Sequence, residues 1–279
     1  MGQDRENLIS NDIGKGVARD ALGYDPNALP LEVIDMTVAY PGQPPLLEGV
    51  SFKVEHGEIL GILGPSGCGK SSLLRHLVGL EYPRRGTALV LGEDIFANGE
   101  ESLNRARHRF GVMYQSGALF GDLNLLDNVA MPLKEYSRLG PGARKAAAAL
   151  KLALVGLSGF EYHMPAEISG GMRKRAAIAR ALALEPSLLF LDEPGAGLDP
   201  VTATGLDHLI LTLSRNLGLS FVVVTHELRS ILTMIDRAIL LDKTACGIAD
   251  SGTPKYLAEE SEVPAAKAFF LRDQEERAL

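Results

Sequence analysis

A glycine-rich segment, 64-GPSGCGKS-71, matches the pattern G-x-x-x-x-G-K-[ST] of a phosphate-binding loop. Glycines let a backbone curl so that successive N–H groups point into one anion-sized hollow, and the start of a following helix adds positive charge. Lys70 can supply a mobile cation for the terminal phosphates, and the Ser71 hydroxyl can ligate Mg²⁺. The loop predicts nucleotide binding, but GTPases, kinases and several lineages of ATPases share it.

Three more polar groups follow short apolar runs. The segment 188-LLFLDE-193 ends in Asp192 and Glu193, and a carboxylate pair at the end of a strand is well placed to organise Mg²⁺ and to activate water beside a bound phosphate. His226 closes 221-FVVVTH-226, and Gln115 closes 110-FGVMYQ-115. A single histidine or glutamine says little, so its position at the end of a predicted strand is what makes each a candidate.

A second candidate anion site lies at 168-ISGGMRKR-175. A serine hydroxyl and flexible N–H groups at the start of a helix can hold a phosphate, although a Ser-Gly-Gly sequence is also an ordinary helix cap.

The pattern around these residues predicts an α/β fold. Apolar and polar residues alternate over 32–40 and 50–57, which predicts an antiparallel β region. Apolar runs at 59–63, 188–192, 221–225 and 238–242 alternate with helical segments, as in a mostly parallel sheet flanked by helices. A helical subdomain is expected at about 116–186. We expect a mobile N-terminal extension over 1–30, one domain over 31–255 and a helical tail over 256–279.

Composition narrows the classes of function. The chain of 279 residues has a net charge of −7, so a nucleic-acid-binding role is disfavoured. Its two cysteines form no C-x-x-C pair, which argues against a disulfide framework or a zinc cluster. The longest apolar runs are far shorter than the roughly 20 residues that span a bilayer, and the N-terminus lacks the apolar centre of a signal peptide.

Together these motifs resemble the ABC ATPase family, over roughly residues 31–255. Its Leu-Ser-Gly-Gly-Gln signature is present with Ile168 and Met172 as departures. The resemblance implies ATP and Mg²⁺ as cofactors and a head-to-tail homodimer with two nucleotides between the subunits. It also implies a role for each matching residue. The ATP-binding residues are Tyr40 (stacking on adenine), Gly64, Pro65, Ser66, Gly67, Cys68, Gly69, Lys70, Ser71 and Ser72; the catalytic residues are Glu193 (general base), His226 and Gln115; the Mg²⁺ ligands are Ser71, Gln115 and Asp192; and the residues facing the partner subunit are Ser169, Gly170, Gly171, Met172 and Asp199.

Within the family, 115-QSGALFGDLNLLDNVAMPL-133, Met172 and 197-GLD-199 are most similar to ATPases of MCE-type phospholipid transporters, the Mla and toluene-tolerance group. That resemblance implies an integral-membrane permease, an MCE lipid-binding protein, a small STAS-domain protein and a peripheral location on the cytoplasmic face of the inner membrane. Two alternatives stay open: the ATPase of an importer for amino acids or other small solutes, and a regulatory ABC ATPase without a transporter.

Overall fold

The structure is a computed structural model that describes residues 28–276, with side chains to residue 271. The predicted extension over 1–30 therefore lies outside the described residues except for its last three positions, and the end of the predicted tail, 277–279, lies outside them as well.

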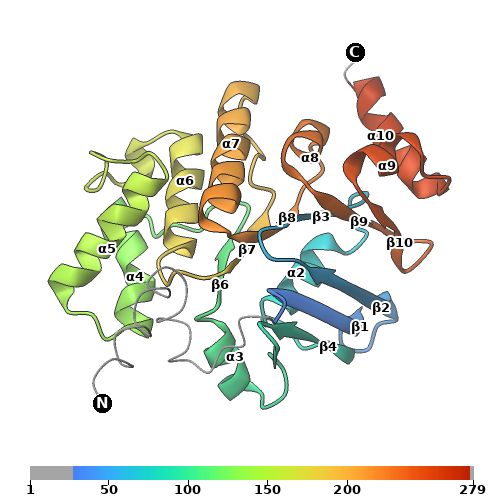
Figure 1. The fold of residues 1–279 in the computed structure, drawn as a ribbon, viewed down its shortest axis with the longest axis horizontal. Helices are drawn as coiled ribbons and strands as arrows, with labels where there is room; N and C mark the ends of the chain where they lie inside the picture. Colours follow the sequence, from blue (N-terminus) through green and yellow to red (C-terminus); the bar gives the residue numbers. More distant parts are fainter. Residues whose placement is uncertain (1–27, 277–279) are drawn as a thin grey trace, which may run out of the picture.

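Six strands form the sheet that carries most of the motifs, in the order β10-β9-β3-β8-β7-β6 (Figure 1). Five of them run parallel to their neighbours, and β10 pairs antiparallel with β9 at one edge. β3 and β8 are buried along their whole length, because both faces of a parallel sheet are covered. The strands are β3 (Ile59–Leu63), β6 (Phe110–Met113), β7 (Leu188–Asp192), β8 (Ser220–Val224), β9 (Arg237–Asp242) and β10 (Gly247–Gly252).

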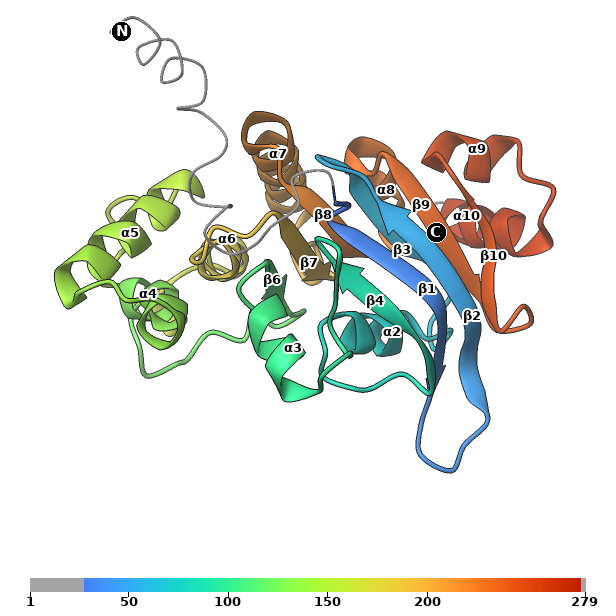
Figure 2. The ribbon, with the colours of Figure 1, turned by 60° about the horizontal axis from the view of Figure 1, so that its bottom comes forward.

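A second, antiparallel sheet has the order β2-β1-β4-β5 and lies beside helix α2 (Figure 2). Alternate residues of β3 separate two cores: Leu60 and Ile62 face this sheet and α2, whereas Ile59 and Leu63 face the helices on the other side. The strands are β1 (Leu31–Ala39), β2 (Pro45–Val54), β4 (Arg85–Val90) and β5 (Glu93–Asp94).

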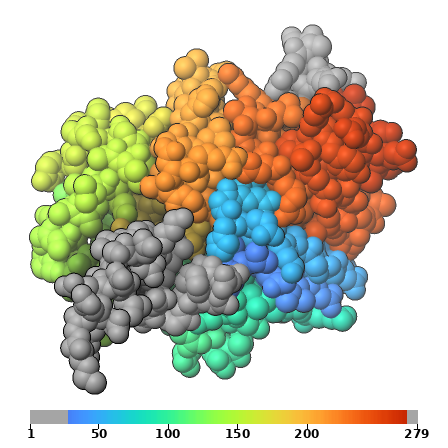
Figure 3. Space-filling model, viewed as in Figure 1, coloured from blue at the N-terminus to red at the C-terminus, as the bar shows by residue number. Residues whose placement is uncertain are grey.

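Helices cover the six-stranded sheet and extend it at both ends. α4, α5 and α6 form a helical block at one end, within the predicted 116–186 segment, and α9 and α10 pack at the other end beside β10 (Figures 1 and 3). The helices are α2 (Lys70–Leu77), α3 (Glu100–Ala106), α4 (Leu125–Tyr136), α5 (Pro141–Leu154), the 3-10 helix η1 (Pro165–Glu167), α6 (Gly170–Ala181), α7 (Pro200–Leu217), α8 (Leu228–Met234), α9 (Pro254–Glu259) and α10 (Pro264–Glu276).

Parallel pairing positions the predicted site. Because β3, β8, β7 and β6 are consecutive neighbours with one direction, their carboxyl ends meet at the same edge of the sheet. Ligands of open α/β sheets bind at this edge. The phosphate loop, the carboxylate pair, His226 and Gln115 follow these four strands.

Candidate nucleotide and catalytic site

The phosphate loop joins β3 to α2 through backbone that only glycine tolerates at two points. Gly64 has a φ of +143°, and a Cβ there would lie 2.4 Å from the Leu241 carbonyl oxygen and 2.7 Å from the Cys68 sulfur. Gly69 has a φ of +109° and immediately precedes α2. Cys68 is buried beneath the loop, and this burial raises the pKa of its thiol despite the opposing charge of Lys70. Cys68 thus supports the loop from below.

The charged and hydroxyl groups of the loop lie at the start of α2. The Lys70 ammonium donates to the carbonyl oxygens of Gly64 at 2.7 Å and Pro65 at 3.1 Å, which curls its side chain back over the loop. Ser66, Gly67 and Ser71 are exposed. The loop therefore presents one ammonium and free hydroxyls at a helix N-terminus, which is chemistry suited to phosphate oxygens.

Tyr40 directly follows β1 and lies beside the phosphate loop. Its hydroxyl lies 2.9 Å from the Ser72 hydroxyl, and its side chain is 49% exposed. The contact places an accessible aromatic ring beside the phosphate loop, as predicted for adenine stacking, although the stacking itself stays a prediction.

Asp192 is the last residue of β7 and Glu193 follows it, and each has one carboxylate oxygen without a hydrogen-bond partner. Asp192 Oδ1 and Glu193 Oε2 are buried and accept no hydrogen bond. Burial, and then the charge of Glu193, raise the pKa of the Asp192 carboxyl. An unpaired buried carboxylate oxygen is costly unless a ligand satisfies it, so this pair of atoms marks a place where a cation or a proton is accepted.

Glu193 has a backbone conformation that is rare for a residue with a side chain. Its φ is +47°, and its N–H donates to the Val224 carbonyl oxygen at 2.8 Å, which ties the turn after β7 to β8. Such strain is concentrated at functional sites. The turn aims the Glu193 carboxylate at the neighbouring strand end, where Glu193 Oε1 lies 2.7 Å from His226 Nδ1.

His226 and Gln115 complete the edge. The His226 side chain is 63% exposed, against 12% for Glu193, so the imidazole shields the carboxylate on the open side. Gln115 is exposed two residues beyond β6. The structure thus brings Lys70, Asp192, Glu193, His226 and Gln115 to one edge, as their positions after predicted strands indicate.

Lys174 is a site residue that the sequence reasoning missed. It lies in α6, is only 7% exposed, and its ammonium donates to the carbonyl oxygens of Gln115 and Glu193. Burial lowers the pKa of Lys174, and the charges of Asp192 and Glu193 oppose that effect. The sequence does carry a signal for it. Lys174 is a lysine on the face of the signature helix whose other buried residues, such as Ala177 and Ile178, are small or apolar.

The candidate metal ligands fit a hard cation. Mg²⁺ takes oxygen ligands, keeps several waters and is commonly bound through one or two carboxylates together with substrate phosphates. The buried Asp192 Oδ1 without a partner provides one such oxygen, and the exposed Ser71 hydroxyl provides another. Within residues 28–276 no group of three or more His, Cys, Asp and Glu side chains could hold a metal ion.

The signature segment and Asp199 form a separate group. Ser169 caps α6, its hydroxyl accepting from the Met172 N–H at 3.2 Å, and Asp199 caps α7, accepting from the N–H groups of Val201 and Thr202. A hydrogen bond from the Thr202 side chain, and then the backbone N–H groups of Thr202 and Val201, lower the pKa of Asp199. In the described part of the chain, no hydrogen bond or ion pair links Ser169 or Asp199 to the phosphate loop.

Packing explains the residue types at positions 171 and 172. A Cβ at Gly171 would lie 2.3 Å from Thr202 Cγ2, so this glycine permits the close approach of α6 to α7. The Met172 side chain is partly buried against the core of the helical block, which explains why an apolar side chain is accommodated here.

Comparisons with known proteins agree with this arrangement. The family model described as "ABC transporter" matches residues 47–196. The intermembrane phospholipid transport system ATP-binding protein MlaF of Escherichia coli K12 is 45% identical over 199 residues, which cover 71% of this chain and 74% of MlaF. The "Probable ribonucleotide transport ATP-binding protein mkl" of Mycobacterium tuberculosis H37Rv is 41% identical over 216 residues, 77% of this chain. The chain spans 60% of the length of that mycobacterial relative.

A solved structure also matches. The dimeric ATP-binding cassette MJ0796, bound to ADP and Pi in a post-hydrolysis state, has a TM-score of 0.72 and 28% identity, covering 80% of this chain and 98% of that one. The chain belongs to the ABC transporter family of ATP-binding proteins. The predicted family and fold class are therefore confirmed. No helix within residues 28–276 is long and apolar enough to cross a bilayer.

Proposed function

We propose that this chain is the ATP-hydrolysing subunit of an ABC transporter that moves phospholipid between the membranes of a Gram-negative-type envelope. The observation that carries the hydrolytic part is the pair of buried carboxylate oxygens, Asp192 Oδ1 and Glu193 Oε2, without partners at the sheet edge that holds the phosphate loop.

Each residue has a distinct task in the proposed reaction. The backbone N–H groups of the loop and Lys70 bind the phosphates, and Tyr40 stacks on adenine. Ser71, Gln115 and Asp192 would hold Mg²⁺, which when bound would neutralise charge on the terminal phosphates. Glu193 accepts a proton from the attacking water. His226 holds Glu193 Oε1 at 2.7 Å and leaves Oε2 for the water.

The second phosphate contact comes from a partner subunit in this proposal. Ser169 and Asp199 are both exposed at helix starts, and Val201 beside Asp199 is an apolar residue that is 81% exposed. These features support a surface that a second copy covers, with the Ser169–Gly171 segment and Met172 facing the γ-phosphate held by the other copy. ATP then acts as a ligand that shifts the dimer toward its closed state.

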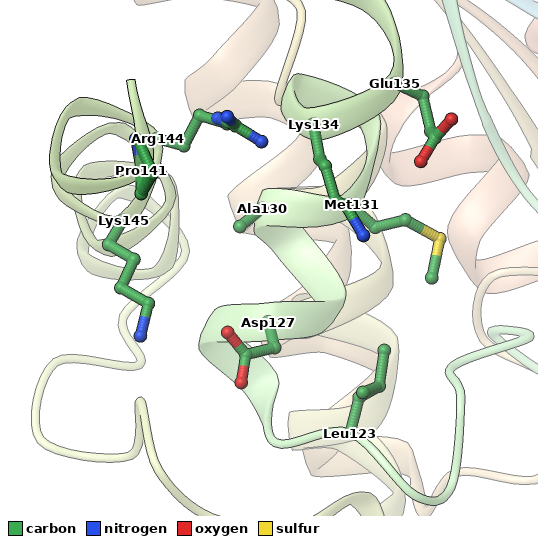
Figure 4. A pocket seen from close by; sticks show the side chains of 9 residues that line it. All are labelled: Leu123, Asp127, Ala130, Met131, Lys134, Glu135, Pro141, Arg144 and Lys145. Atoms are coloured by element: carbon green, nitrogen blue, oxygen red, sulfur yellow. The ribbon is translucent and has the colours of Figure 1, made fainter. Parts of the chain in front are cut away.

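A hollow in the helical block supports docking of a membrane permease. It has a volume of about 440 Å³ and lies between α4 and α5, after the segment that follows Gln115 (Figure 4). Leu123, Ala130 and Met131 line it with apolar surface, while Asp127, Lys134, Glu135, Arg144 and Lys145 contribute charges. An apolar hollow with charges of both signs suits the end of a short amphipathic helix.

The choice of cargo is supported by similarity in that docking region. Residues 115–133 resemble the same segment of phospholipid transport ATPases, and MlaF, named for intermembrane phospholipid transport, is 45% identical to this chain. We therefore favour lipid over a small solute. The proposed partners are an integral-membrane permease, an MCE lipid-binding protein and a small STAS-domain protein, and the proposed location is the cytoplasmic face of the inner membrane.

The cargo is tested by purifying the tagged chain from its native membranes in mild detergent and identifying bound proteins and lipids by mass spectrometry. A permease with an MCE-domain protein and enriched phospholipid is the expected result. A permease with a solute-binding protein would overturn the lipid assignment, and recovery without any permease would favour a regulatory ATPase.

The base is tested with Glu193→Gln. This variant should bind ATP, accumulate as a dimer and hydrolyse ATP at least about 100-fold more slowly, because general base catalysis typically contributes 10²–10⁴-fold. Glu185→Gln is a matched control, since Glu185 is an exposed glutamate that pairs with Lys151 away from this edge. Normal turnover in Glu193→Gln would refute the assigned base.

A further inference from the structure

Lys174 bridges two parts of the site that are distant in sequence. Its ammonium contacts the carbonyl oxygens of Gln115, 59 residues earlier, and Glu193, 19 residues later at 3.2 Å. Those residues follow the adjacent parallel strands β6 and β7, whereas Lys174 belongs to α6 of the helical block. One side chain therefore connects three elements.

Burial of this ammonium is costly, which makes a purely structural filler a poor explanation. Lysine is almost never buried to this degree unless it is paired. Its nearby charges, Asp192 and Glu193, are the two carboxylates of the candidate site. A methionine would fill much the same space without desolvating a charge. The hydrogen bonds to the Gln115 and Glu193 carbonyl oxygens therefore explain why an ammonium is present.

A second cation of α6, Arg180, also donates hydrogen bonds to the segment that follows Gln115. Arg180 donates to the carbonyl oxygens of Gly117 at 2.9 Å and Ala118 at 2.6 Å. Lys174 and Arg180 together attach the segment 115–118 to α6, and Lys174 extends the attachment to the turn that carries Glu193. Movement of the helical block would thus pull on Gln115 and Glu193 at once.

The strained turn needs this contact. Glu193 has a φ of +47°, and its peptide groups are hydrogen-bonded on both sides. Its N–H donates to Val224, and its carbonyl oxygen accepts from Lys174 and from the Ala196 N–H, both at 3.2 Å. Left-handed backbone costs an ordinary residue energy and persists where the surroundings fix it. Without Lys174 the carbonyl would be held by the Ala196 N–H alone, so the turn could relax and shift the carboxylate.

We propose that Lys174 is a positioning residue that fixes the Glu193 carboxylate relative to the Gln115 segment and so links the helical block to the step that activates water. This inference rests on the proposed roles of Glu193 and Gln115. A misplacement of about 1 Å at a reacting group can cost about 100-fold in rate. Lys174 makes no hydrogen bond to the phosphate loop in the described structure, so binding of ATP should not depend on it.

The test measures kcat, KM and the Kd for ATP on the full chain carrying Lys174→Met or Lys174→Gln. Lys174→Met, which removes both hydrogen bonds, should lower kcat about 10- to 100-fold and leave the Kd within about threefold of wild type. Lys174→Gln keeps N–H donors on a shorter side chain, so its kcat should lie between those of wild type and Lys174→Met. Lys151→Met, which removes a lysine of the same block that pairs with Glu185, should leave kcat unchanged.

The outcomes separate this role from general stability and from the assigned base. A folded Lys174→Met protein with wild-type kcat would overturn the proposal, as would a loss confined to Kd. If Lys174→Met does not fold, Lys174→Gln decides: a kcat reduced at least fivefold with unchanged Kd supports the role, and a wild-type kcat overturns it. Glu193→Gln is measured in parallel, because normal turnover there refutes the base, whereas wild-type kcat in Lys174→Met with an inactive Glu193→Gln refutes only the role of Lys174.

Discussion

Asn128 is predicted to hold the segment between the catalytic edge and the proposed permease hollow. It is fully buried in the first turn of α4, and its amide makes four hydrogen bonds. The side-chain oxygen accepts from the Phe120 N–H at 2.8 Å, and the NH₂ group donates to the carbonyl oxygens of Phe120, Leu123 and Asn124. Asn128→Ala removes all four at once.

The size of the effect follows from what each partner retains. The Asn124 carbonyl still accepts from the Asn128 N–H at 3.0 Å, and the Phe120 carbonyl from the Leu123 N–H at 3.3 Å. The main losses therefore fall on the Phe120 N–H and the Leu123 carbonyl. Phe120 is exposed and Leu123 is half-buried, so each group left unpaired should cost about 1–2 kcal/mol, the lower part of the range for buried groups. Asn128→Ala should therefore destabilise the fold by about 2–4 kcal/mol.

The assay is thermal unfolding followed by fluorescence, with Asn124→Ala as the matched control. Asn124 is less buried and makes one capping hydrogen bond to the Asp127 N–H, whose loss costs about 1 kcal/mol. At about 2–4 °C per kcal/mol, Asn128→Ala should lower Tm by roughly 4–16 °C and Asn124→Ala by roughly 2–4 °C. Equal shifts in the two variants would refute the view that Asn128 is the anchor of this segment.

Three other predictions test separate features. Cys68 is buried with a raised pKa, so iodoacetamide at neutral pH should label the partly exposed Cys246 first; faster labelling of Cys68, read by peptide mass spectrometry, would contradict the buried loop geometry. Met172→Gln should leave kcat within about twofold and cost about 1 kcal/mol of stability, because its side chain packs on the core of the helical block; a large loss of kcat at unchanged Tm would show that the side chain acts in the reaction. Burial raises the pKa of Asp207 despite its hydrogen bond from Ser230. The folded state therefore binds the Asp207 proton more tightly than the unfolded state, and the fold loses stability as pH rises above the unfolded pKa of about 3.9. Asp207→Asn should therefore gain Tm relative to wild type between pH 4 and pH 7, and a pH-independent difference would contradict this.

Local sequence patterns were sufficient for the fold class and for the residues at the strand ends. Continuous apolar runs predicted the buried strands β3, β7 and β8, because a strand covered on both faces has no polar positions. The complete phosphate-loop pattern predicted the strand, loop and helix that the structure contains. The short elements β5, α3 and α8 were not assigned, because two to seven residues give too little periodicity to distinguish them from loops.

Some motif residues also have a structural role that the motifs do not reveal. Gly171 and Asp199 were assigned to the surface between subunits, but the structure also gives Gly171 a close approach to α7 and Asp199 a helix cap. Sequence resemblance cannot separate these reasons, since both select the same residue type. Substitutions at the two positions can separate them, because packing and capping change Tm whereas phosphate contact changes kcat.

The sequence by itself determined which residue types end each strand, because apolar periodicity and the loop pattern are local. Only the tertiary structure decided the strand order β3-β8-β7-β6, which brings residues from Lys70 to His226 to one edge, because pairing of parallel strands depends on contacts distant in the chain. The same holds for Lys174. Its charge is visible in the sequence, but its function follows from burial between two carbonyl oxygens that folding alone brings within reach of one side chain.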